Sequence, residues 1–140
     1  MDKYLDSNIC PLPWNHLEVD VNGGASPCCL YKGSIPGVKV YEQSLTSIQQ
    51  SDYMEVLRKK FRDGERPKGC QNCWQEEDAG KTSKRQNSIY KMGKSLENWT
   101  PNSEPTLKFI DFKLGNVCNL KCRICGSWSS SKWAQEELDY

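Results

Sequence analysis

Residues 115–128, GNVCNLKCRICGSW, place three cysteines within eight residues. Cys118, Cys122 and Cys125 are separated by three residues and then by two. Thiolates at this spacing can surround one face of a small iron–sulfur cluster, because the loop that joins them can curl around it and direct amide N–H groups at sulfur. Four-iron clusters are commonly held by four cysteines, so a trio leaves one iron open. The spacing therefore predicts a cluster that can bind a further ligand.

Zinc is the alternative for these three cysteines. Zinc sites usually combine two short ligand pairs across a longer gap, and no Cys or His follows Cys125. The spacing therefore fits zinc poorly. Cysteines with no shared ligand are the third possibility.

The three cysteines lie between a predicted strand and a predicted helix. Residues 107–114, LKFIDFKL, alternate imperfectly, as a strand buried on most sides does. Residues 129–140, SSSKWAQEELDY, have the pattern of a helix without a C-cap. One strand and one helix cannot bury their own faces. We therefore expect the chain to be a fragment of a longer protein or a truncated reading frame.

The run CNLKC-RIC after a hydrophobic strand resembles the signature of the radical S-adenosylmethionine (SAM) enzymes. This resemblance implies that Cys118, Cys122 and Cys125 hold a [4Fe-4S] cluster whose open iron binds SAM. It also implies reductive cleavage of SAM to a 5′-deoxyadenosyl radical, which abstracts a hydrogen atom from substrate. A strongly reducing cluster suits that chemistry. Ile124 departs from the pattern, because an aromatic residue is frequent there.

A second set of cysteines occupies the first half of the chain. Twelve residues separate Cys10 from Gly23 and four separate Gly23 from Cys28, whereas Cys70 and Cys73 follow after a long gap. This spacing resembles the first half of a SPASM domain, the shorter "twitch" arrangement that binds an auxiliary [4Fe-4S] cluster in many radical SAM enzymes. The resemblance implies that these four cysteines are ligands. Four structural cysteines on zinc remain the alternative.

Local patterns agree with a four-cysteine site. Residues 16–24, HLEVDVNGG, predict a hairpin that brings Cys10 near Cys28, and the close spacing of Cys70 and Cys73 predicts a single turn. A closed shell of four thiolates predicts a structural or electron-relaying cluster. Adjacent side chains in an extended segment point to opposite faces, and the spacing after Gly23 favours Cys28. Cys29 is then expected to be a small buried hydrophobe.

Helical patterns fill the space between the cysteines. Residues 44–67 place Tyr53, Leu57 and Phe61 on one face, with Ser51 as N-cap and Gly64 as the stop. The acidic residues 76–78 suit the first turn of a second helix. Two prolines among polar residues predict a linker over residues 94–106.

Composition limits the classes of function. The 140 residues suit one domain, or one and a piece, and the net charge of +1 gives no pull towards nucleic acid or an anionic membrane. Hydrophobic residues make up only 36 %, so the eight cysteines are expected to stabilise a thin core by binding metal. No apolar run approaches a membrane span and no secretory signal is evident. We expect a cytoplasmic location, where thiols stay reduced.

Three further features have a structural and a functional interpretation. His16, the single histidine, is expected to be packed or hydrogen-bonded rather than a ligand. Trp74 is expected to be a core residue, with shielding of a cluster as the alternative. The basic residues between Gly80 and Lys94 are expected to form a solvated helix face. A docking surface for an acidic redox donor or peptide, using Lys84 and Arg85, is the alternative.

Together these features predict a small α+β cluster-binding domain over residues 1–93, a linker over 94–106, and the start of a truncated partial (β/α) barrel over 107–140. Two [4Fe-4S] clusters and SAM are the expected cofactors, with a donor such as flavodoxin or ferredoxin and a peptide or small molecule as substrate. The auxiliary domain usually follows the catalytic one in this superfamily, and here it precedes it. Barrels take about 250 residues, so we expect this chain alone to bind SAM weakly or not at all. A small iron–sulfur electron carrier and a zinc-stabilised interaction module are the competing hypotheses.

Overall fold

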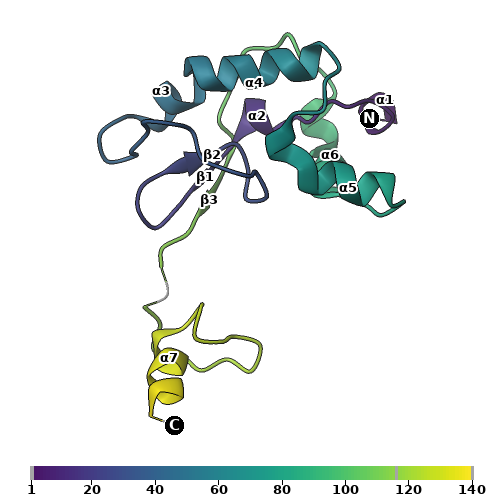
Figure 1. Cartoon of the computed structure of the whole chain (residues 1–140). Coiled ribbons are helices and arrows are strands. Elements are labelled where there is room, and N and C mark those ends of the chain that lie inside the picture. Colours follow the sequence, from purple (N-terminus) through teal and green to yellow (C-terminus); the bar gives the residue numbers. More distant parts are fainter. Residues whose placement is uncertain (1, 116, 140) are drawn as a thin grey trace.

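The computed structural model describes residues 2–115 and 117–139. Residues 2–115 form its main body, which contains one three-stranded sheet. Strand β1 (His16–Val19) lies in the centre, between β2 (Ala25–Ser26) and β3 (Phe109–Phe112). It runs antiparallel to β2 and parallel to β3. The strands lie side by side beneath the helices (Figure 1). This arrangement confirms the prediction of a small α+β fold.

The predicted hairpin is present between β1 and β2. The Asp20 carboxylate accepts hydrogen bonds from the amides of Asn22 (2.7 Å) and Gly24 (3.0 Å), which closes the turn. Gly23 lies in the left-handed region with a φ of 78°, where a glycine is favoured. All four residues of β1 are buried rather than alternating, because the strand has a neighbour on each edge and side chains packed on both faces.

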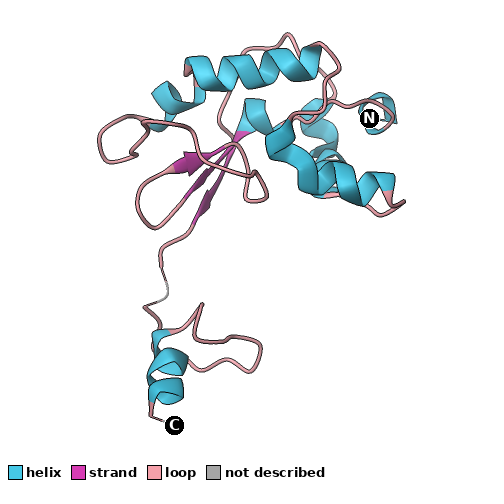
Figure 2. Cartoon of the chain, in the orientation of Figure 1, coloured by secondary structure: helices cyan, strands magenta, loops and turns pink. Residues whose placement is uncertain are grey.

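Helices surround one end of the sheet, as Figure 2 shows. None of those within residues 2–115 and 117–139 is long and apolar enough to cross a membrane. In chain order they are α1 (Asp2–Leu5), α2 (Leu12–Asn15), α3 (Leu45–Gln49), α4 (Asp52–Arg62), the 3-10 turn η1 (Lys68–Cys70), α5 (Gln71–Asp78), α6 (Lys84–Met92), the 3-10 turn η2 (Gly93–Leu96) and α7 (Ser131–Leu138).

Helix α4 confirms the helical pattern of the sequence. It begins after Ser51 and ends before Gly64, whose φ of 76° stops it. Leu57 and Phe61 are buried as their spacing predicts. The pattern upstream of Ser51 forms the separate short helix α3, capped by Ser44, whose hydroxyl accepts a hydrogen bond from the Ser47 amide (3.1 Å).

Helix α5 differs from the prediction. It begins at Gln71, so Cys73 lies in its first turn and the acidic residues 76–78 lie in its last turn. Acidic residues are unfavourable near the C-terminal end of a helix dipole. A tertiary contact offsets this cost, because Glu77 accepts hydrogen bonds from the Arg85 side chain on α6.

Two hydrophobic clusters hold the body together. The larger contains Trp14, which packs against Phe61 (6.4 Å between ring centroids) and Trp99 (5.3 Å). The smaller contains Leu17 of β1 and Ile48 of α3. Trp99 belongs to the segment expected to be a linker, and its carbonyl accepts a hydrogen bond from the Tyr4 hydroxyl (2.6 Å). Residues 94–106 are therefore partly core rather than a free connection.

Strand β3 lies within the predicted segment but is not buried on most sides. Phe109 and Phe112 are 45 % and 55 % exposed, because β3 forms the edge of the sheet. His16 ties it to β1, with Nε2 3.1 Å from the Asp111 carboxylate and Nδ1 3.0 Å from the Pro27 carbonyl. The histidine is 4 % exposed, which agrees with a packed, hydrogen-bonded residue.

Candidate metal centres

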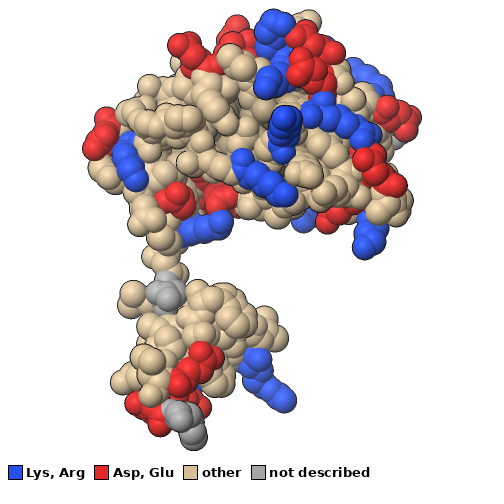
Figure 3. All heavy atoms as spheres, in the orientation of Figure 1, with Lys and Arg blue, Asp and Glu red and all other residues tan. Residues whose placement is uncertain are grey.

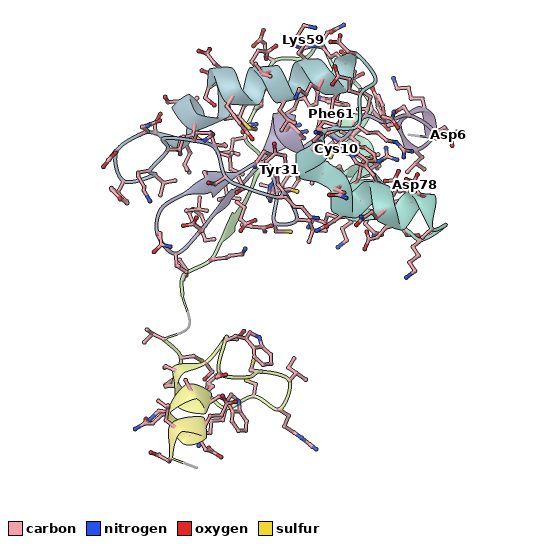
Figure 4. The ribbon with its side chains drawn as sticks, viewed as in Figure 1. Asp6, Cys10, Tyr31, Lys59, Phe61 and Asp78 are labelled. Carbon is pink, nitrogen blue, oxygen red and sulfur yellow. The ribbon has the colours of Figure 1, made fainter. Side chains whose placement is uncertain are left out.

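Four cysteines from separate parts of the chain line one small cavity. Cys10 precedes α2, Cys28 follows β2, Cys70 ends the η1 turn and Cys73 lies in the first turn of α5. Figure 4 labels Cys10 in this region, beside α5. The remaining wall consists of Leu12, Leu30, Trp74, Lys84 and Arg85. The fold thus brings together the same four cysteines that the sequence singled out.

Burial governs the protonation of these thiols. It raises the pKa of Cys10 well above its ordinary value, and the nearby Cys70 and Cys28 raise it further. Burial likewise raises the pKa of Cys28 to about 11 and that of Cys70 to about 12, and it raises the pKa of Cys73. Bare thiolates are therefore disfavoured in this cavity. A positively charged group that binds them would have to displace their protons.

Backbone amides oppose this desolvation by pointing at sulfur. Such N–H groups are typical of iron–sulfur sites, where they tune the cluster. The amides come from Leu12 to Cys10, from Leu30 and Tyr31 to Cys28, and from Lys84 and Arg85 to Cys73.

The start of α6 supplies two of these amides. A helix face between Gly80 and Lys94 was expected, but not that its first amides would lie at a thiol. The first amides of a helix have no partner within the helix, so they are free to donate elsewhere. Ser83 and Gln86 form a reciprocal capping box that defines this helix start. The S-x-x-Q spacing of residues 83–86 is the signal that could have revealed it.

The structure places Cys28 rather than Cys29 at the cavity. Cys29 does not line the cavity, and it is partly exposed rather than the buried hydrophobe that was expected. A two-residue turn from Cys28 to Tyr31, in which the Tyr31 amide donates to the Cys28 carbonyl (3.1 Å), directs the chain past the cavity.

The cavity that the four cysteines help to line has a volume of about 20 Å³. About one water molecule fits such a volume. A cluster of several atoms would therefore require the thiol side chains to rotate outward. Within residues 2–115 and 117–139, no three Cys, His, Asp or Glu side chains are placed to bind a single metal ion.

Arg85 forms part of this wall and is not a solvated helix residue. Its side chain is 2 % exposed and pairs with Glu77. Its guanidinium also donates to four backbone carbonyls in the segment before Cys10, those of Tyr4, Leu5, Ser7 and Ile9 (2.8–3.1 Å). Because Arg85 is buried, it cannot belong to the docking surface considered for Lys84 and Arg85. The sequence gives no sign of these distant partners, so the burial could not be foreseen.

Trp74 is a core residue, as the sequence predicts, and it also borders the cysteine cavity. It is 6 % exposed within the larger hydrophobic cluster, and it also lines the cysteine cavity. Its indole N–H donates to the Pro67 carbonyl (3.2 Å), and the Arg66 and Arg85 side chains lie over its ring. The ring therefore keeps water from one side of the thiols.

Cys118, Cys122 and Cys125 lie together on the loop that precedes α7. Desolvation and then the neighbouring Cys122 and Cys118 raise the Cys125 pKa, and the Cys125 amide donates to the Cys122 carbonyl (3.0 Å). Two contacts with α7 close the loop: the Cys118 amide donates to the Ser131 hydroxyl (3.2 Å), and the Trp133 indole donates to the Cys122 carbonyl (3.1 Å). The loop and α7 form a unit apart from the main body (Figure 1).

Comparison with known proteins identifies the segment that contains the cavity. Residues 10–74 match the SPASM family, an iron–sulfur cluster-binding domain. The matched segment contains all four cysteines of the cavity. The prediction of an iron–sulfur cluster-binding domain in this part of the chain is thereby supported. No curated protein and no solved structure matches the chain.

Proposed function

We propose that this chain provides both cysteine sets of a radical SAM enzyme. Cys10, Cys28, Cys70 and Cys73 would hold an auxiliary [4Fe-4S] cluster, and Cys118, Cys122 and Cys125 would hold the cluster that binds SAM. The observation that carries the proposal is the convergence of four distant cysteines on one cavity, inside a segment that matches an iron–sulfur cluster-binding domain.

The chemistry of the four-cysteine cavity fits a cluster. Its donor atoms are four thiols, its amides point at sulfur, and Leu12, Leu30 and Trp74 keep water away. The backbone amides at the start of α6 place partial positive charge beside the Cys73 thiolate, which burial alone disfavours. With every ligand position of the metal occupied by cysteine, this site would serve structure or electron transfer.

The three-cysteine loop has the donor set for the second cluster. When bound there, the cluster and SAM would supply reductive cleavage of SAM to a 5′-deoxyadenosyl radical. The loop itself carries all three thiols, and its bonds to Ser131 and Trp133 anchor it on α7. Cys122 is exposed, so the loop is open to a ligand.

The position of the loop also supports the proposal. It follows β3, which we propose as the first strand of a partial (β/α) barrel, and active sites of such barrels lie at the carboxyl ends of their strands. In the part of the chain that the structure describes, the outer edge of β3 pairs with no other strand, so a further parallel strand has room to join. We further propose a cytoplasmic enzyme with a peptide or small-molecule substrate and a flavodoxin or ferredoxin as donor.

Iron counting on each cysteine set tests the proposal. Anaerobic reconstitution followed by iron and sulfide analysis and electron paramagnetic resonance (EPR) should give about eight irons per chain, from one four-iron cluster in each set. The triple variant Cys118/Cys122/Cys125→Ala should retain about four irons. Zinc in place of iron, or unchanged iron in the triple variant, would refute the assignment.

A further inference from the structure

A second cavity, of about 480 Å³, lies next to the cysteine site. Helix α4 forms one side of it and residues 65–69 form the other, so it ends one residue before the candidate ligand Cys70. Its volume is that of a small-molecule pocket. None of the cysteines lines it, so the proposed clusters do not account for it.

Two tyrosines form its inner wall. The hydroxyl groups of Tyr31 and Tyr53 are 2.8 Å apart and share a hydrogen bond, which joins the loop after Cys28 to α4. Gly69 allows this arrangement, because a Cβ atom there would lie 2.3 Å from the Tyr31 ring. Leu57 is buried beside the tyrosines, and Val56 is 56 % exposed. The wall is thus apolar and aromatic, with hydroxyl groups at one point.

Positive charge dominates the rim. Lys60, Arg66 and Lys68 line the cavity, with Glu65 as its one acidic residue. Arg66 pairs with Asp78 (2.7 Å), whereas Lys60 and Lys68 form no ion pair with any residue of the described ranges. Figure 3 shows basic side chains gathered on this face, between α4 and α5. Two uncompensated ammonium groups therefore face a cavity that has an apolar wall.

We propose that this cavity binds a small organic anion, with a carboxylate or phosphate group on an aromatic or apolar body. The acidic group would bind Lys60 and Lys68 at the rim, since charge-assisted hydrogen bonds to an ammonium are the strongest polar contacts available there. The body would lie against Tyr31, Tyr53 and Leu57, where removal from water favours binding. The site is independent of SAM chemistry and needs neither proposed cluster for recognition.

Calorimetric titration of the reconstituted full chain tests this inference. Phenyl phosphate and phenylacetate are the two probes, because they carry the two candidate acidic groups on the same ring. Inorganic phosphate and benzyl alcohol are the controls for the acid alone and for the ring alone. We expect both probes to bind, the better one identifying the preferred acid, and both controls to bind at least about tenfold more weakly.

Matched lysine variants separate the cavity from the general charge of the surface. Lys60→Gln and Lys68→Gln should each weaken binding of the better probe by at least about fivefold. Lys59→Gln is the control, because Lys59 precedes Lys60 on the same helix, pairs with Asp63 (2.5 Å) and points away from α5 (Figure 4). Both lysines of the rim are exposed, so loss of folding is not expected.

Three results would overturn the inference. Inorganic phosphate that binds as tightly as phenyl phosphate would show a surface charge effect without an apolar subsite. Equal weakening by Lys59→Gln and Lys60→Gln would show that the cavity plays no part. Absence of binding by both probes would remove the site. None of these results bears on the iron content, so they are distinct from a failure of the proposed function.

Discussion

The Arg85 guanidinium donates to both carboxylate oxygens of Glu77, through Nε and Nη2, at 2.8 Å each. Glu77 is in the last turn of α5 and Arg85 is in the first turn of α6, so the pair fixes the angle between these helices. Both helices carry atoms of the cysteine cavity: the Cys73 thiol and the amides that point at it. The ion pair therefore holds one cysteine against the helix that hydrogen-bonds it.

Replacement of Arg85 by Met should destabilise the protein strongly. The change leaves Glu77 buried without its partner and four backbone carbonyls without a donor, and breaking a buried pair typically costs about 3–5 kcal/mol. Urea unfolding of the reconstituted chain measures the loss. Lys91→Met is the control, because Lys91 is exposed on the same helix. A loss below about 1 kcal/mol would contradict the role of Arg85 as a buried hub.

Glu77 should make stability depend on pH in the acidic range. Burial raises its pKa, but hydrogen bonds from Arg85 and Ser83 outweigh burial and leave the pKa below the ordinary 4.5. A carboxyl whose pKa is lowered by folding stabilises the folded protein. This stabilisation is fully present above the pKa of the unfolded state and is lost as the pH falls through the pKa of the folded state.

Unfolding free energies measured from about pH 6 down to about pH 3.5 should therefore fall more steeply in the wild type than in Glu77→Gln. Both proteins contain the same cysteines, so the acid sensitivity of any cluster cancels in the comparison. Parallel curves would show that the carboxylate does not contribute.

Neighbouring cysteines offer a direct test of the cavity. Cys28→Ala should lose about four of about eight irons, because it removes one of four ligands of the auxiliary cluster. Cys29→Ala should retain about eight irons, since Cys29 lies outside the cavity. Iron and sulfide analysis after anaerobic reconstitution gives the answer. The opposite pattern would assign the ligand to Cys29.

Gly69→Ala should destabilise the protein by about 1–3 kcal/mol, the usual cost of overpacking. The added methyl group would lie 2.3 Å from the Tyr31 ring and push it away from Tyr53. Thermal unfolding of a double-mutant cycle checks the cause. In a Tyr31→Ala background the same glycine substitution should cost little, and an undiminished cost there would exclude the ring as the reason.

Local sequence patterns predict much of this fold. The spacing of Leu57 and Phe61 and the stop at Gly64 define α4, because helical periodicity and a glycine stop act within a few residues. Ser51 takes the predicted N-cap position, but its side chain makes no capping hydrogen bond. The turn at Gly23 defines the hairpin for the same reason. The periodicity and the turn depend on neighbours in the chain, so they can be predicted from the sequence. The four cysteines of the cavity were singled out through the resemblance of their spacing to a SPASM domain.

Features that depend on distant partners became visible only in three dimensions. Arg85 looks like a surface cation in a basic helix, yet it is buried because carbonyls 76–81 residues earlier accept its hydrogen bonds. Trp99 looks like part of a linker, yet it packs on Trp14. Burial of a charge or an aromatic ring depends on which surfaces the folded chain brings to it. Such long-range pairing leaves no periodic or local trace in the sequence, so the tertiary structure alone decided it.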